Sequence, residues 1–224
     1  MAILRQQRAA DSPLIERVTR VVFDGADLDV STPDGCWDIV IMRHQGRVTV
    51  LQTGVITRPV KLDYVSGDEY LCISFKPGVF MPTNPGDSMV DRAFVRPVDG
   101  DRTFWFDQDR LEIPSFENAE ALVSRLTRQR ALVRDEIVAG VADGDPRATS
   151  ERSLQRHFQL SMGITAKRFD QILRARRAVE LIEQGRPIVN VAHELGYADQ
   201  SHLTRAVKAL MGRTPGAITR QRRP

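Results

Sequence analysis

The sequence carries one pattern twice, as SERSLQRHFQLSMGITAKRF at Ser150–Phe169 and as DQSHLTRAVKALMGRTPGAI at Asp199–Ile218. Each copy opens with a residue that suits a helix N-cap and reaches a Met-Gly pair that suits a helix C-terminus. The pattern predicts two similar cationic helices, and duplex DNA is the polymer that such a pair fits best. Aligned without gaps, the copies share Leu154/Leu203, Arg156/Arg205, Met162/Met211, Gly163/Gly212 and Thr165/Thr214.

Helical geometry divides each copy into an inner and an outer face. Successive residues of a helix are 100° apart around its axis. When the apolar residues at 154, 158, 203 and 207 face the protein core, the polar side chains of each copy therefore face outward. Arginine and glutamine suit bidentate contacts with guanine and adenine, whereas lysine more often meets phosphate. The alternative is an ordinary solvent-facing surface. The predicted DNA-binding residues are Arg152, Gln155 and Arg156 in the first copy and Gln200, Ser201, Thr204, Arg205 and Lys208 in the second.

The segment between the two copies predicts a rigid spacer. Apolar residues at 172, 175, 179 and 182 form a buried stripe on a helix expected over Ala166–Gln184. Such a helix is about 30 Å long, and successive major-groove faces recur about every 34 Å along one side of DNA. The spacer would therefore hold the two reading helices about one DNA turn apart.

Charge is divided unevenly along the chain, although the net value is only +3. Residues 1–120 hold 13 Lys and Arg against 19 Asp and Glu, whereas residues 121–224 hold 19 against 10. A basic half joined to an acidic half is typical of a DNA-binding domain with a separate sensor or partner domain. The alternative is a solvated surface whose charges are merely uneven.

The acidic half is predicted to be rich in short strands. Runs at 17–23, 37–42, 47–51 and 70–75 are apolar, β-branched or aromatic and are separated by turn residues, which favours a sandwich or small barrel. Residues 81–100 are expected to be loop with at most a short helix. A helical stretch follows, whose apolar period weakens at Gln129. It would link the domains or pair with a second subunit, and the alternative is a helix packed on its own domain. The predicted class is α+β, with a β-rich domain at 1–114, a helical linker at 115–142 and an all-α DNA-binding domain at 143–224.

Further segments of the C-terminal part carry a resemblance to a known family. They read RARRAVELI at 174–182, PIVNVAHELGYADQSHLTR at 187–205 and KALMGRTPGAI at 208–218. Together with the first copy they resemble the AraC/XylS family of bacterial transcription regulators. The resemblance implies two helix-turn-helix units joined by a long helix, double-stranded DNA as ligand and RNA polymerase as partner. It also adds His202 to the candidate DNA-binding residues, with a role in bonding the helix start as the alternative.

The first unit departs from the family pattern. Where the family has a clear helix of the type LAxxxGxS, this chain has IVAGVADGDPRATS at 137–150. The proline and glycines of that stretch predict a shortened or irregular first unit that docks less rigidly.

The N-terminal half carries a weaker resemblance to sensor domains found in part of the family. It rests on PDGCWDIVI at 33–41, YLCISFKPGVF at 70–80 and SFENAEALVSRL at 115–126. The resemblance implies a cupin-like barrel whose mouth binds a small-molecule effector. Trp37, Phe75, Phe80 and Met81 are the candidate ligand-binding residues, with a purely structural core role as the alternative. The two cysteines have no CxxC spacing and no histidine cluster, so no metal and no cofactor are predicted.

These features together predict a sequence-specific transcription regulator of the AraC type without catalytic residues. An activator is expected because that role is the commoner one in the family. The alternatives are a cupin-type enzyme with an attached DNA-binding module and a non-specific architectural DNA-binding protein. The chain shows no signal peptide and no apolar run that would span a bilayer, so a cytoplasmic, nucleoid-associated bacterial protein is expected. A homodimer is left open.

Overall fold

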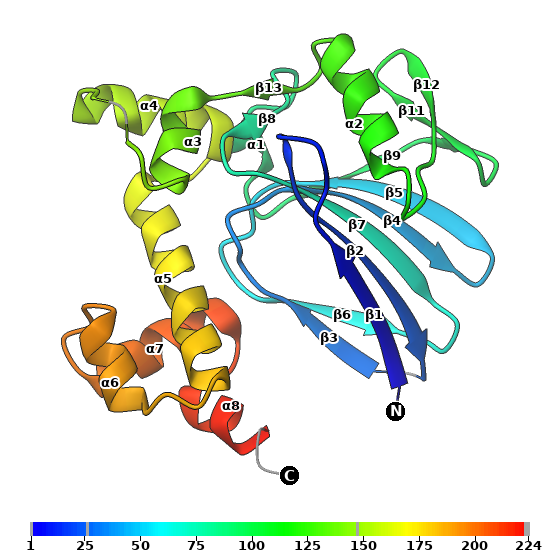
Figure 1. Ribbon diagram of the computed structural model, residues 1–224. Helices are drawn as coiled ribbons and strands as arrows, with labels where there is room; N and C mark the ends of the chain where they lie inside the picture. Colours follow the sequence, from blue (N-terminus) through cyan, green and yellow to red (C-terminus); the bar gives the residue numbers. More distant parts are fainter. Residues whose placement is uncertain (1, 26, 147, 222–224) are drawn as a thin grey trace.

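The computed structural model describes residues 2–25, 27–146 and 148–221, and it confirms the predicted α+β class. Figure 1 shows the strands gathered in the N-terminal part and the helices in the C-terminal part. The long helix α5 (Ala166–Glu183) runs along one side of the strand-rich domain (Figure 1).

Six antiparallel strands form the main sheet in the order β1-β2-β7-β4-β5-β9. Along β7, Leu71, Ile73 and Phe75 alternate toward the core, as the period of a strand requires. The described strands include no pair between the outer strands β1 and β9, so the sheet is open where the resemblance implied a barrel. The members are β1 (Ala2–Arg8), β2 (Ile15–Asp24), β4 (Asp38–His44), β5 (Arg47–Thr53), β7 (Glu69–Phe75) and β9 (Ala93–Arg96).

Three smaller sheets complete the domain. They pair β3 (Asp27–Ser31) with β6 (Val60–Tyr64), β8 (Val79–Phe80) with β13 (Val133–Arg134), and β11 (Thr103–Phe106) with both β10 (Val98–Asp99) and β12 (Asp109–Glu112). The short helix expected in 81–100 is α1 (Gly86–Met89). The expectation of loop around it was wrong for β9 and β10, because these strands depend on pairing with distant segments.

One hydrophobic cluster joins the sheet to its covering helix. The rings of Trp37 and Phe75 stack with their centroids 4.0 Å apart. Helix α2 (Ala119–Arg128) buries Leu122, Val123 and Leu126 in the same cluster. This helix therefore belongs to the core of the strand-rich domain.

The helix expected over 115–142 is divided. Helix α2 ends before Gln129, and Arg130 has a left-handed φ of 56°. Strand β13 then pairs with β8 before α3 (Glu136–Ala142) begins at its N-cap, Asp135. The break in the apolar period at Gln129 therefore marks the end of a helix.

The C-terminal part is helical, as predicted. This part has its own cluster of buried residues, which includes Phe158, Phe169, Leu203 and Val207. These residues come from both copies of the repeated pattern and from the spacer, so the two copies share one core. The helices are α4 (Glu151–Met162), α5, α6 (Ile188–Glu194), α7 (Gln200–Met211) and α8 (Pro215–Gln221).

A partly buried carboxyl group lies at the start of β4. The Oδ1 atom of Asp38 is buried and has no hydrogen-bond partner among the described residues. Burial and the negative charge of Asp34 raise the pKa of Asp38 to about 6, against a hydrogen bond from Ser74 and the positive charge of Arg17. Ionisation of Asp38 therefore opposes folding.

We expect the contribution of Asp38 to the free energy of unfolding to fall as the pH rises from about 4 to about 6, because Asp38 holds its proton more tightly in the folded state. This contribution is complete below the pKa of the unfolded chain and is lost as the pH passes the folded-state value. Asp38→Asn should remove it, so the stability of the variant relative to the natural chain should grow by up to about 3 kcal/mol over that range. Denaturant titrations across the range measure the difference, with the exposed Asp63→Asn as control. Parallel stability curves for Asp38→Asn and the natural chain would contradict the prediction.

Candidate nucleic-acid interface

The first predicted reading helix, α4, is capped at both ends. Ser150 accepts a hydrogen bond from the N–H of Ser153 at 3.2 Å and caps the N-terminus. Gly163 ends the helix with a left-handed φ of 69°, which glycine adopts without strain. Phe158 and Met162 are buried beneath the helix, so its opposite face is turned to solvent.

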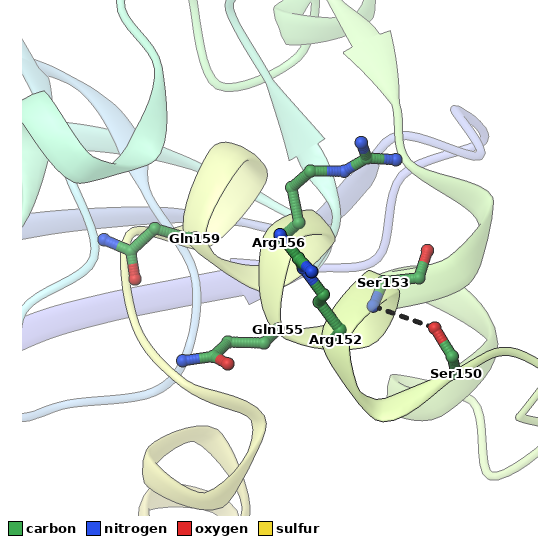
Figure 2. A pocket seen from close by; sticks show the side chains of 6 residues that line it. All are labelled: Ser150, Arg152, Ser153, Gln155, Arg156 and Gln159. Atoms are coloured by element: carbon green, nitrogen blue, oxygen red, sulfur yellow. Dashed lines mark hydrogen bonds between the residues drawn. The ribbon is translucent and has the colours of Figure 1, made fainter.

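The exposed face of α4 is polar and cationic. Arg152, Gln155 and Arg156 are exposed, as the helical geometry predicted, and their side chains extend from the helix in Figure 2. Arg177 and Arg186 elsewhere in the domain have carboxylate partners, whereas no described carboxylate pairs with Arg152 or Arg156. These two cations are thus available to phosphate or base edges. With neighbouring side chains they border an open hollow of about 560 Å³, whose residues are Ser150, Arg152, Ser153, Gln155, Arg156 and Gln159 (Figure 2).

The second reading helix, α7, repeats the construction of α4. Both helices have 12 residues. Asp199 accepts a hydrogen bond from the N–H of His202 at 2.6 Å, and Gly212 ends the helix with a left-handed φ of 71°. Leu203 and Val207 are buried, whereas at the matching positions of the first copy Phe158 is buried and Leu154 is partly buried. The two copies therefore fold alike because the same local signals stand at the same positions.

The predicted contact residues of α7 lie on its outer side. Gln200, Ser201, Arg205 and Lys208 are exposed and Thr204 is partly buried. Within the described residues no carboxylate pairs with Arg205 or Lys208.

His202 is placed at the start of α7. The N–H of Ala198 donates to its Nδ1 at 3.4 Å, and the edge of its ring faces Tyr197 at 5.3 Å. The guanidinium of Arg174, on α5, lies over the ring of Tyr197, 4.8 Å from its centroid. His202 therefore takes part in holding the turn before α7 against α5.

Helix α5 separates the two reading helices. It has 18 residues, so its length is about 27 Å. Thr165 caps it by accepting from the N–H of Arg168 at 3.1 Å, and the matching Thr214 accepts from the N–H of Ala217 at 3.2 Å before α8. Figure 1 shows α4 at one end of α5 and α7 at the other. The spacer predicted from the sequence is therefore present.

The connection between the two helices of the first helix-turn-helix unit is longer than that of the second. Helices α3 and α6 each have seven residues, so the first helix is no shorter than its counterpart in the second unit. The turns differ, because residues 143–150 separate α3 from α4 whereas 195–199 separate α6 from α7. Asp135 also joins the two helices of the first unit, since its Oδ2 lies 2.8 Å from Nδ1 of His157.

Three of the four candidate ligand-binding residues meet at one cavity. Trp37, Phe80 and Met81 line it together with Met162 of α4, and Phe75 stacks beneath Trp37 without lining it. Its volume is about 20 Å³, which is room for a single water molecule. The cavity therefore lies between the strand-rich domain and the first reading helix and is nearly filled by its own side chains.

Polar residues that sequence reasoning missed stand at the same cavity. Gln52 and Asn84 line it, and both accept hydrogen bonds from Nη2 of Arg96. The ring of Phe106 lies under the guanidinium of Arg96, with its centroid 4.3 Å from the Cζ atom. No local pattern marks this group, because its members come together only through the pairing of β9 with β5.

The contacts between the domains were also missed. Nη2 of Arg168 donates to the carbonyl oxygen of Thr57 at 2.7 Å, and Nη1 of Arg176 donates to that of Asp34 at 3.2 Å. Both arginines lie on α5, two helical turns apart, and this spacing was the only available signal. These bonds attach α5 to the strand-rich domain.

None of the described helices combines the length and apolar character that a bilayer crossing needs. Among the same residues, His, Cys, Asp and Glu side chains form no group of three that would hold a metal ion.

Residues 147–221 match a protein family described as "Helix-turn-helix domain". Two similar solved structures are of ToxT from Vibrio cholerae. One, bound to (E)-4-(8-methylnaphthalen-1-yl)but-3-enoic acid, is 10% identical over 98% of this chain and 99% of that chain, with a TM-score of 0.48. The other, of a P21 crystal form, is 11% identical over 94% of this chain and 96% of that chain, with a TM-score of 0.37. No curated protein sequence matches the chain.

The family match spans both reading helices, the spacer between them and their caps. It coincides with the quoted segments that resemble the AraC/XylS regulators. The C-terminal part of this chain is therefore a helix-turn-helix domain of the AraC type, the kind that DNA-binding transcription regulators carry.

Proposed function

We propose that this protein is a one-component transcription regulator that reads two adjacent major grooves from one side of the DNA. The observation that supports the proposal is the pair α4 and α7, two 12-residue helices with matched caps at opposite ends of α5. The length of α5, about 27 Å, is comparable to the repeat of the major groove, about 34 Å. In this proposal the base contacts come from Arg152, Gln155, Arg156, Gln200, Ser201, Thr204 and Arg205, Lys208 meets phosphate, and His202 supports the start of α7.

The test is selection of bound duplexes from a random pool, followed by hydroxyl-radical footprinting of the selected site. We expect two protected patches about 10 base pairs apart on one face of the duplex. Protection of a single groove would contradict the proposal. Competition with random DNA tests the architectural alternative, because a regulator should prefer its site by about 10³-fold or more.

Lys208→Ala should weaken binding evenly across sequences and lower the dependence on salt. A phosphate contact releases counterions, so the slope of log K against log salt should become shallower by about 1. Binding titrations at several salt concentrations measure the slope. Lys61→Ala, which removes an exposed lysine of β6, is the matched control and should leave the slope unchanged. An unchanged slope for Lys208→Ala would remove this residue from the interface.

We further propose that a small-molecule effector acts at the cavity lined by Trp37, Phe80, Met81 and Met162. Because the cavity now has room for about one water, an effector would have to displace the flexible methionine side chains. A change in the melting temperature and in Trp37 fluorescence on adding candidate compounds would support this role. A fluorescence change that persists in the Trp37→Phe variant, which keeps only Trp105, would count against it.

The sign of regulation is proposed to be activation, with RNA polymerase as the partner. Run-off transcription from a promoter that carries the selected site should increase when the protein is added, and a decrease would make it a repressor.

Metal analysis of the purified protein addresses the enzyme alternative, which stoichiometric iron or manganese would favour. Sedimentation shows whether the protein acts as a homodimer.

A further inference from the structure

The two helix-turn-helix units are supported by different parts of the molecule. The second head (α6 and α7) packs, together with α8, on the spacer α5. The first head (α3 and α4) packs mainly elsewhere, because α4 contacts α1 of the strand-rich domain more extensively than it contacts α5. The position of the first head relative to the second therefore depends on the strand-rich domain.

The contact between α1 and α4 is backbone against backbone. A Cβ atom added at Gly86 would lie 2.3 Å from the backbone nitrogen of Gly163, the C-cap of α4. A Cβ atom added at Gly163 would lie 2.2 Å from the carbonyl oxygen of Gly86. Real Cβ atoms do not approach other atoms so closely, so each position has room only for glycine.

Helix α1 is held from its other side as well. A Cβ atom added at Gly54, just after β5, would lie 2.0 Å from the carbonyl oxygen of Met89. Close by, the N–H of Gly78 donates to Sδ of Met162 at 3.4 Å, which ties the last turn of α4 to the strand-rich domain. Because α1 is wedged between the sheet and α4, a displacement of α1 must be passed on to α4.

We propose that α1 sets the register between the two reading helices and that Gly86 is a positioning residue for the spacing of the DNA site. The close glycine contact fixes where the first head stands, while the second head packs on α5 and α8, with Gly212 at the end of α7 close to Pro59 of the strand-rich domain. The inference rests on the proposed DNA binding. It goes further by assigning the choice of half-site spacing to the strand-rich domain.

Gly86→Ala tests the proposal directly. The φ of Gly86 lies outside the left-handed region, so alanine is permitted there and the clash with Gly163 is the main consequence. Gly216→Ala is the matched control, because an added Cβ at Gly216 meets no atom within 4 Å. The probes are the duplex selected by the natural chain and the same duplex with one or two base pairs inserted or removed between its half-sites.

The natural chain should bind best at the selected spacing. Gly86→Ala should lose about tenfold or more at that spacing, as expected when one head no longer meets its bases, and should bind best at a different spacing. Its affinity for the second half-site alone should stay unchanged, and Gly216→Ala should match the natural chain throughout. A spacing profile for folded Gly86→Ala that equals the natural one would overturn the proposal.

A second variant covers the case in which circular dichroism shows that Gly86→Ala does not fold. Cγ2 of Val90 lies 2.3 Å from the place of an added Cβ at Gly163, so Val90→Ala loosens the same contact without inserting an atom. It should flatten the spacing profile, and an unchanged profile would equally overturn the proposal. If the natural chain protects no pair of patches, the proposed function itself fails, and that result differs from an unchanged profile.

Discussion

Phe169→Ala should lower the free energy of unfolding by about 3–5 kcal/mol, the range for truncating a buried phenylalanine. The ring of Phe169 is 2% exposed, and its centroid lies 5.6 Å from that of Phe158. Its edge also covers Gly35 so closely that a Cβ atom added there would lie 2.5 Å from the ring. The substitution therefore opens a cavity where α4, α5 and the strand-rich domain meet. Chemical denaturation followed by circular dichroism measures the loss.

Leu160→Ala is the control for this prediction. Leu160 lies on α4 with 46% of its surface exposed, so its truncation should change stability by no more than about 0.5 kcal/mol. If Phe169→Ala lowered the free energy of unfolding by less than about 1 kcal/mol, the prediction that this ring is central to the core would be wrong. Two separate transitions would show that the ring couples the unfolding of the domains.

Arg205→Ala should weaken binding to the selected duplex by about 1–3 kcal/mol and relax the preference at one base position. Arg205 is exposed on α7, it has no carboxylate partner among the described residues, and it occupies the position that Arg156 takes on α4. Selection from a random pool, repeated with the variant, shows which base loses its preference.

The matched control is Arg177→Ala on α5. Arg177 is exposed and paired with Glu180, so its removal changes the net charge equally without touching a reading helix. It should leave both the selected sequence and the affinity nearly unchanged. If Arg205→Ala behaved like this control, α7 would not be a reading helix.

Local signals explain which elements could be predicted. Ser150, Asp199, Gly163 and Gly212 act within one turn of their own helices, so caps and bounds could be inferred from short stretches. The strands β2, β4, β5 and β7 were predicted for a similar reason, since their own residues alternate or are β-branched.

Non-local pairing explains what was missed. Strand β9 has four residues, three of them exposed, and exists through its pairing with β5. Strand β13 has two residues and exists through its pairing with β8, which is why the linker looked like one continuous helix. The predicted contact residues of α4 and α7 lie on the outer side of their helices, but whether they touch DNA stays a prediction.

Helix periodicity and capping chemistry were enough to recognise two like helices, their polar faces and the spacer between them, because those interactions join residues at most a few positions apart. Neither periodicity nor capping predicts which distant residues hold the first helix-turn-helix unit (α3 and α4) in place. Gly86 and Gly163 are 77 positions apart, and neither is marked by its neighbours as a contact. Their approach follows from the packing of α1 between the sheet and α4, which arises only when distant segments exclude water together.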